Sequence, residues 1–237
     1  MFKNRFINYM CYTICGAIGS ELIFRLIVMW KKRFLDDEKD VNEVLWTNDL
    51  TQLCREKHKT RVSPCKTPYC FIKNLNRVTE IINNAQHTID LSMYIFTVED
   101  IAESFIRAHK RGVKIRIICD EAMVYSAGSQ IITLNKIGIP VRFQSSASMI
   151  MHHKFCICDG HTELSIFKMH MKKATPILIT GSTNWTFQGF ASNWDNLIIT
   201  SNRALLKQFE SEFERTWNLF NNNKDWACEP KDKTETA

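Results

Sequence analysis

The sequence predicts an α/β fold in which helices flank a central mixed, mostly parallel β-sheet. Between residues 76 and 220, segments with the two-residue period of strands alternate with segments that have the 3.6-residue period of helices. Glycines such as Gly112 and Gly138 follow helical segments, as expected where a chain leaves a helix. Strands and helices that alternate in this way place parallel strands at the centre of the sheet.

The elements are expected in a regular order along the chain. The predicted strands cover residues 88–96, 113–119, 141–144, 177–180 and 195–200, with one more at the motif described below. The predicted helices cover residues 76–84, 98–111, 128–136 and 204–220. The last helix has an apolar face that is more typical of a core than of a binding surface, made of Leu205, Phe209, Phe213, Trp217 and Phe220.

The chain of 237 residues divides into four predicted parts. Residues 1–33 are a membrane anchor, residues 34–75 a linker with a Cys/His cluster, residues 76–222 the α/β domain, and residues 223–237 a disordered polar tail. Within the linker, residues 35–50 are acidic and mixed, as in a spacer or a short strand. No internal repeat is visible.

The N-terminal segment, residues 7–30, is largely apolar and long enough to cross roughly 30 Å of hydrocarbon as a helix. Its charges Glu21 and Arg25 are four residues apart and can pair on one helical face. Three basic residues, 31–33, close the segment, and no small-residue cleavage site follows. We therefore predict an uncleaved signal anchor; a cleaved transit peptide and a buried amphipathic helix are the alternatives. The flanking basic residues lean toward a cytosolic C-terminal domain.

Composition limits the partners and the compartment. A net charge of +6 and a pI near 8.8 favour a polyanionic partner, either nucleic acid or an anionic membrane surface. The nine cysteines are scattered, and several lie in apolar runs, as Cys119, Cys156 and Cys158 do. We expect reduced thiols in a cytosol-facing protein rather than a disulfide framework.

Four potential metal ligands lie within seventeen residues: Cys54, His58, Cys65 and Cys70. Interleaved lysines and the turn-forming pairs at residues 63–64 and 67–68 fit a closed tetrahedral zinc site, although the spacing differs from that of common zinc fingers. Unligated cysteines on a basic loop are the alternative.

Residues 151–160 contain the pattern His-x-Lys-x4-Asp, formed by His152, Lys154 and Asp159. On a strand, His152 and Lys154 would share one face, and His153 would point to the other. A neutral imidazole can attack phosphorus while an ammonium binds the charge that develops on the phosphate oxygens. The pair therefore indicates phosphodiester chemistry.

A second motif, Gly-Ser-x-Asn, follows the apolar run of residues 176–180 and contains Gly181, Ser182 and Asn184. It is expected at the carboxyl edge of a strand, where hydroxyl and amide groups can donate to phosphate oxygens. An acidic residue, Asp195, comes eleven positions after Asn184.

Together these motifs resemble the phospholipase D superfamily and its HKD signature over residues 76–220. With the N-terminal features, they resemble its mitochondrial branch, called Zucchini in insects. The resemblance implies a phospholipase D-like α/β sandwich, anchored in the mitochondrial outer membrane with the catalytic domain facing the cytosol. It also implies a structural zinc ion held by the Cys/His cluster, and no catalytic metal. Because the motif occurs once, two copies of His152 would meet in a symmetric homodimer.

The resemblance implies a role for each site residue. One His152 forms a phosphohistidine and the other protonates the leaving oxygen; Lys154, Ser182 and Asn184 bind the phosphate. Asp195 matches the family's acidic residue that holds the imidazole, although the family more often has Glu there. Asp159 completes the signature, and we expect it to be an internal structural partner within the motif.

The resemblance leaves two substrates open. One is single-stranded RNA, cleaved to 5′-phosphate ends from piRNA precursors; the other is cardiolipin, hydrolysed to phosphatidic acid. The basic residues Arg55, Lys57, Lys59, Arg61 and Lys66 favour RNA. A non-enzymatic scaffold is a third class, which the intact motif set opposes. Residues 161–175 depart from the family pattern as a basic insertion, either a surface loop that meets substrate or an error in the gene model.

Overall fold

The computed structural model describes residues 20–21, 23–26, 29, 40–58, 65–144, 149–160 and 174–220. The chain forms two compact units, Met1–Asp40 and Val41–Ala237. In the first unit, Arg25 and Glu21 form the predicted ion pair, at 3.1 Å. No helix among the described residues is long and apolar enough to cross a membrane. The predicted anchor, residues 7–30, lies largely outside the described residues, as does the predicted tail after residue 222.

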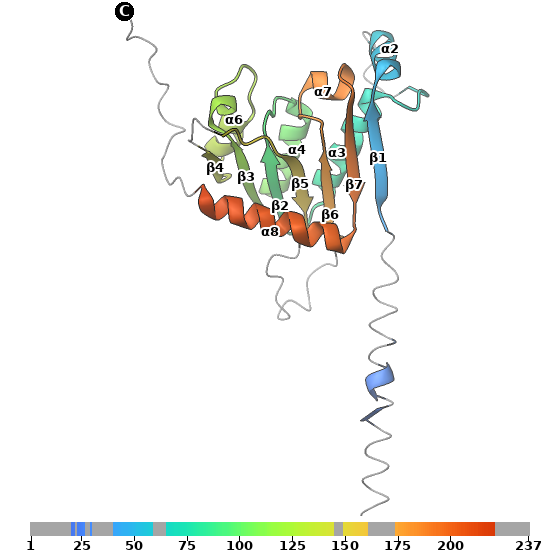
Figure 1. Ribbon diagram of the computed structural model, residues 1–237, viewed down its shortest axis with the longest axis vertical. Coiled ribbons are helices and arrows are strands. Elements are labelled where there is room, and N and C mark those ends of the chain that lie inside the picture. Colours follow the sequence, from blue (N-terminus) through green and yellow to red (C-terminus); the bar gives the residue numbers. More distant parts are fainter. Residues whose placement is uncertain are drawn as a thin grey trace, which may run out of the picture. The chain divides into compact units, whose positions relative to one another are not determined.

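The second unit contains a seven-stranded mixed sheet in the order β1-β7-β6-β5-β2-β3-β4 (Figure 1). The strands are β1 (Asn42–Thr47), β2 (Thr88–Met93), β3 (Lys114–Asp120), β4 (Val141–Gln144), β5 (Lys154–Cys158), β6 (Ile177–Gly181) and β7 (Asp195–Thr200).

The prediction of a mostly parallel sheet is wrong. Only β2–β3 and β3–β4 are parallel, whereas β1–β7, β7–β6, β6–β5 and β5–β2 are antiparallel. A parallel pair needs a crossover connection, usually a helix, and such helices occur only between β2 and β4. From β5 onward the strands follow one another without a helix that crosses the sheet.

The helices are α2 (Asp49–Lys57), α3 (Phe71–Asn84), α4 (Glu99–Lys110), α5 (Glu121–Val124), α6 (Ile131–Lys136), α7 (Phe187–Ala191) and α8 (Arg203–Leu219). Helix α3 begins five residues before its predicted start, because Phe71, Ile72 and Leu75 extend its apolar face. Helix α6 begins later than predicted, after Gly128, whose φ of 77° is left-handed.

The sheet is covered on both faces. Helices α3 and α4 enclose the main core, which contains Phe96, Phe105 and Trp185, and α8 lies over the opposite face (Figure 1). Under α8 a smaller core forms around Ile118, Phe155 and Phe213. Leu205 of the predicted apolar face is 42% exposed instead, because Leu206 is the residue that turns toward the sheet.

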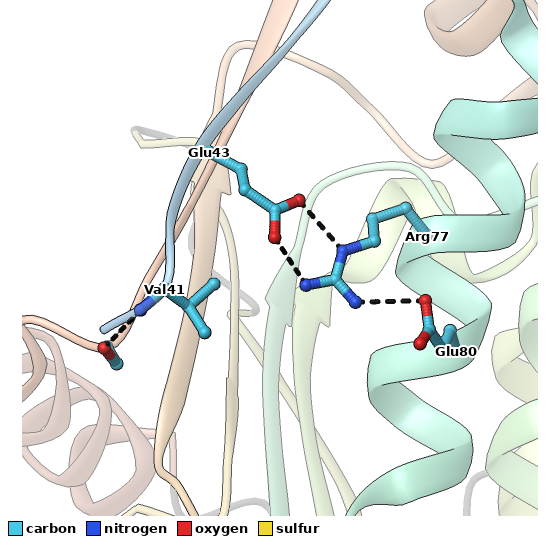
Figure 2. A network of polar contacts seen from close by, with 5 residues as sticks. Val41, Glu43, Arg77 and Glu80 are labelled. Atoms are coloured by element: carbon cyan, nitrogen blue, oxygen red, sulfur yellow. Dashed lines mark hydrogen bonds and ion pairs between the residues drawn. The ribbon is translucent and has the colours of Figure 1, made fainter. Parts of the chain in front are cut away.

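Ion pairs join α8 to the sheet and β1 to α3. Arg116 on β3 binds Asp90 at 2.7 Å and Glu214 of α8 at 2.6 Å. At the other side of the sheet, Arg77 of α3 forms a two-point contact with Glu43 of β1, at 2.6 and 2.9 Å, and also binds Glu80 (Figure 2). The segment predicted as a spacer or a short strand thus contains an edge strand, which pairs with β7.

Candidate active site

Both sequence motifs lie at one edge of the sheet. Strands β2, β3 and β6 run toward this edge, and the antiparallel strands β5 and β7 start from it. Lys154 begins β5 here, and Gly181 ends β6. The topology thus brings together residues that are separated by more than 40 positions in the sequence.

His152 and Lys154 are in direct contact. The Lys154 ammonium lies 3.1 Å from Nδ1 and 3.2 Å from Nε2 of His152, and it donates to the His152 carbonyl at 2.9 Å. His152 is exposed, whereas Lys154 is only 9% exposed. His152 precedes β5 rather than lying on it, so the strand period is not what pairs the two side chains.

The surroundings favour the neutral form of the imidazole. Desolvation and the Lys154 charge lower the pKa of His152, while the Asp120 carboxylate acts in the opposite direction. Desolvation also lowers the pKa of Lys154, against the influence of Asp195. A neutral imidazole has a free lone pair, which a nucleophile at phosphorus requires.

His153 points away from this pair, as predicted. Its Nδ1 lies 3.4 Å from the hydroxyl of Ser92, and its ring packs against Phe155 at 5.5 Å between centroids. It lies on the α8 side of the sheet but remains exposed, so the expectation that it is packed is not met.

The Gly-Ser-x-Asn segment turns sharply beside the start of β7. A Cβ at Gly181 would collide with the backbone carbonyl of Asn196, so only glycine fits. Ser182 donates to Asp195 at 2.6 Å and accepts the amide N–H of Asn196 at 3.1 Å. These bonds fix the segment that carries Asn184.

Asn184 has a side-chain carbonyl oxygen that is buried and, within the described part of the chain, has no hydrogen-bond partner. Buried polar atoms are normally paired, so an unpaired one beside the motif edge indicates a group that a ligand completes. A phosphate oxygen is an acceptor, so the Nδ2 group of Asn184 would donate to it, while the carbonyl oxygen would need a donor from the ligand.

The hydrogen bonds of Asp195 lie within its own loop. Its carboxylate accepts from Ser182 at 2.6 Å and from Asn193 at 3.0 Å, and among the described residues no hydrogen bond joins it to the imidazole. The short Asp side chain is bonded within its own loop instead, and it influences Lys154 electrostatically.

Asp159 lies at the opposite end of β5, roughly 16 Å from Lys154 at 3.3 Å per residue. Its carboxylate accepts the backbone N–H groups of Gln86, His87 and Thr88, at 3.0, 2.6 and 3.2 Å. Its backbone φ is 54°, and it is 5% exposed. Although Asp159 completes the signature, it lies away from His152, and its contacts belong to the turn before β2, in line with the expected structural role.

Two residues at the site were missed by sequence reasoning. The ring of Tyr94, just after β2, lies 4.6 Å from the His152 ring. Asp120, the last residue of β3, accepts the Met151 amide N–H at 3.0 Å. A polar residue that follows an apolar strand toward the motif edge is a signal that could have identified both.

The Cys/His cluster is assembled as predicted. The ligand atoms of Cys54, His58, Cys65 and Cys70 all lie within 4.8 Å of one another. Two thiols are 3.4 Å apart, close to the sulfur separation expected around a tetrahedral zinc ion, so this donor set could bind a metal. A hydrogen bond from the Thr67 side chain lowers the pKa of Cys65 to about 5, whereas burial raises the pKa of Cys54 to about 12.

The cluster lies beside helix α7. His58 contacts Phe71, and Phe71 contacts Phe187 of α7, with ring centroids 5.6 and 5.7 Å apart. Arg55 donates to Ser192 at 2.6 Å. Because α7 directly follows Asn184, the Cys/His cluster supports the Gly-Ser-x-Asn segment.

The predicted basic insertion lies mostly outside the described residues, which resume at Ala174. The residues before the gap, Asp159 and Gly160, belong to the end of β5 that is farther from His152.

The fold and the edge motifs define a phospholipase D-like protein. NucT from Helicobacter pylori superposes with a TM-score of 0.54 and 20% identity, covering 76% of this chain and 97% of NucT. Nuc, a phospholipase D family member from Salmonella typhimurium, gives a TM-score of 0.53 and 23% identity over 76% and 95%. At these identities the likeness establishes the fold.

Sequence comparison establishes the family. Residues 78–217 match the family described as "Cardiolipin synthase, PLD-like domain". The mitochondrial cardiolipin hydrolase of Drosophila melanogaster is 37% identical over 87% of this chain and 87% of its own length, and that of Danio rerio is 30% identical over 86% and 83%. The chain belongs to this phospholipase D-like family, and it is a phosphodiesterase-type hydrolase.

Proposed function

We propose that this protein is an endoribonuclease that hydrolyses single-stranded RNA through a phosphohistidine at His152. The observation that carries the proposal is the exposed His152 imidazole, 3.1 Å from the Lys154 ammonium at the edge where Asn184 has an unpaired buried oxygen. A nucleophile, a cation and an amide N–H donor are groups that support phosphoryl transfer, and His152, Lys154 and Asn184 supply them.

The reaction has two displacements. A ring nitrogen of His152 attacks phosphorus and forms an N–P bond, while the P–O3′ bond breaks and the leaving 3′-oxygen takes a proton from His152 of the partner subunit. That second imidazole, now neutral, removes a proton from water; the resulting hydroxide attacks phosphorus and breaks the N–P bond. The product keeps a 5′-phosphate. Lys154, Asn184 and Ser182 bind the phosphate oxygens.

The shared site requires a symmetric homodimer, because each chain carries the motif once. Analytical ultracentrifugation of the active enzyme should find a dimer. An active species that stays monomeric across its working concentrations would contradict the two-histidine mechanism.

The Cys/His cluster would hold one structural zinc ion through Cys54, His58, Cys65 and Cys70. The four donors complete a tetrahedron without a position for water, so the ion would fix the fold beside α7 rather than take part in the reaction. Metal analysis should find about one zinc per chain.

We place the enzyme on the mitochondrial outer membrane, anchored by residues 1–33 with its catalytic domain in the cytosol, where it would process piRNA precursors. The relatives are named as mitochondrial proteins, and residues 7–30 are long enough to span a bilayer. Deletion of residues 1–33 should release the protein from mitochondria; a deletion variant that remains bound would locate the anchor elsewhere.

Cardiolipin hydrolysis to phosphatidic acid is the second candidate. Met149 and Ile150, directly before the motif, are 71% and 63% exposed, and apolar side chains beside the nucleophile suit an acyl chain. The relatives are named for this lipid. RNA is favoured by the basic residues of the Cys/His segment, of which Lys66 is exposed.

The deciding experiment offers single-stranded RNA and cardiolipin liposomes to the purified protein and to its His152→Ala variant. Cleavage of RNA to 5′-phosphate ends, absent in the variant, supports the proposal if lipid is untouched. Phosphatidic acid without RNA cleavage overturns it in favour of the lipid hydrolase.

A further inference from the structure

His152, the proposed nucleophile, lies in a segment without regular secondary structure. Strand β5 begins at Lys154, so the ladder hydrogen bonds of the sheet do not reach the backbone of His152. Its position depends on its two neighbours. The Met151 N–H donates to Asp120 at 3.0 Å, and the His153 carbonyl accepts the Tyr94 N–H at 3.0 Å.

Asp120 is held in a fixed orientation. It is 6% exposed and is the last residue of β3, where the sheet fixes its backbone. Its Oδ1 accepts the Ala122 N–H at 3.1 Å and its Oδ2 accepts the Met151 N–H. Each carboxylate oxygen thus has a backbone donor, and the side chain joins the end of β3 to the segment before β5.

The contact is inside the protein. Met151 is 4% exposed, and its sulfur accepts from the Ser92 hydroxyl at 3.4 Å. A buried amide N–H without an acceptor is costly, so loss of the Asp120 oxygen would make this backbone move. Such a movement displaces His152, the next residue.

We propose that Asp120 is a positioning residue of the phosphodiesterase reaction, because its carboxylate holds the backbone that presents His152 to phosphorus. The proposal rests on the proposed role of His152 as nucleophile. Tyr94 provides the second attachment through its backbone N–H, and its ring limits the rotation of the imidazole.

Asp120 also acts on the imidazole through its charge. The groups that face His152 are Lys154 from β5, Tyr94 from the end of β2 and Asp120 from the end of β3. Desolvation and Lys154 lower the pKa of His152, and Asp120 opposes them. Removal of the carboxylate charge would lower this pKa further, so His152 would stay neutral to a lower pH.

The test is Asp120→Asn in the full chain, assayed with single-stranded RNA and with bis(p-nitrophenyl) phosphate. We expect kcat/KM to fall about 10- to 100-fold, as for a displaced catalytic group. The acid limb of the pH–rate profile should move to lower pH, because it marks protonation of the nucleophile. Hydrogen exchange should increase in peptides that cover residues 149–155.

Asp90→Asn is the matched control. Asp90 is also a buried carboxylate on this sheet, 3% exposed, but it binds Arg116 away from the motif edge. This variant should lose stability while its acid limb and its exchange over residues 149–155 stay as in the parent protein. A general loss of stability is thereby separated from an effect at His152.

Asp120→Glu keeps the charge and moves the acceptor. It should lower kcat while leaving the acid limb near that of the parent protein, and it decides the question if the Asn variant does not fold. Parent-like kcat/KM in the Glu variant, or unchanged exchange and pH profile in the Asn variant, would overturn the proposal. Hydrogen exchange and an NMR titration of His152 require no substrate. They therefore test the role of Asp120 even if the protein does not cleave RNA, and the two failures can be told apart.

Discussion

The two ends of β5 carry the two halves of one sequence signature, and they differ in nearly every physical respect. At one end His152 is exposed, with Lys154 as its polar side-chain contact. At the other end Asp159 is 5% exposed and accepts three backbone N–H groups. A motif that reads as one unit in the sequence therefore divides into a reactive end and a folding end.

The difference is also energetic. Every oxygen of Asp159 is satisfied, whereas at the reactive end Asn184 has an unpaired buried oxygen and desolvation lowers the pKa of Lys154. Unsatisfied groups reduce stability and are typical of sites that bind a ligand. Substitutions at the two ends should accordingly have opposite effects on activity and on stability.

The largest expected effect is at the reactive end. Lys154→Met should reduce turnover by about 10³-fold or more, because the phosphate loses its cation. Its melting temperature at pH 7 should be equal to or above that of the parent protein, because a lowered pKa means that folding opposes the charged form. Phosphodiesterase assays and calorimetry on one preparation measure turnover and melting temperature. A clear loss of stability in the Lys154 variant would contradict the distinction between the two ends of β5.

At the folding end, Asp159→Ala should destabilise the protein by about 3 kcal/mol, because three partly buried backbone amide groups lose their acceptor. Turnover per folded molecule should fall much less than in the Lys154 variant. Denaturant unfolding, together with activity corrected for the folded fraction, tests this. If turnover is lost while stability is kept, Asp159 belongs with the reactive end after all.

Loss of the proposed metal should have an effect between those of the substitutions at Asp159 and at Asp195. Cys70→Ser, or extraction of zinc by a chelator under partly denaturing conditions, should lower the melting temperature by several degrees through α7 and the Asn184 segment. Mild chelation of the folded enzyme should leave activity intact. Immediate inactivation by the chelator, without loss of structure, would instead indicate a metal in the reaction.

The smallest effect is expected at Asp195. Its carboxylate raises the pKa of Lys154, so Asp195→Asn should lower that pKa, and Lys154 should lose its proton at lower pH. We expect a loss of activity of about tenfold or less at neutral pH and an alkaline limb displaced to lower pH. A pH–rate profile measured on both proteins checks the direction; displacement to higher pH would refute the assignment.

Local patterns predicted most elements correctly, because helix and strand periods are properties of short segments. Strand pairing depends on distant segments and was predicted less well: the antiparallel half of the sheet was missed, and for β1 the sequence left a spacer and a short strand open without indicating its pairing with β7. The same limit applies at the site. The closeness of His152 and Lys154 follows from two positions in one motif, whereas the contact of Asp120 with Met151 joins residues 31 positions apart.

The place of β1 has a consequence for biosynthesis. This strand is made first but pairs with β7, and the amide of Val41 bonds to the Ser201 hydroxyl across 160 residues of sequence. At about 5 to 20 residues per second, the ribosome needs roughly 10 to 30 s to make that stretch. During this interval Val44 and Trp46 have no strand beside them. The sheet therefore closes last at the edge that was translated first, and the nascent chain carries an unpaired strand until synthesis is nearly finished.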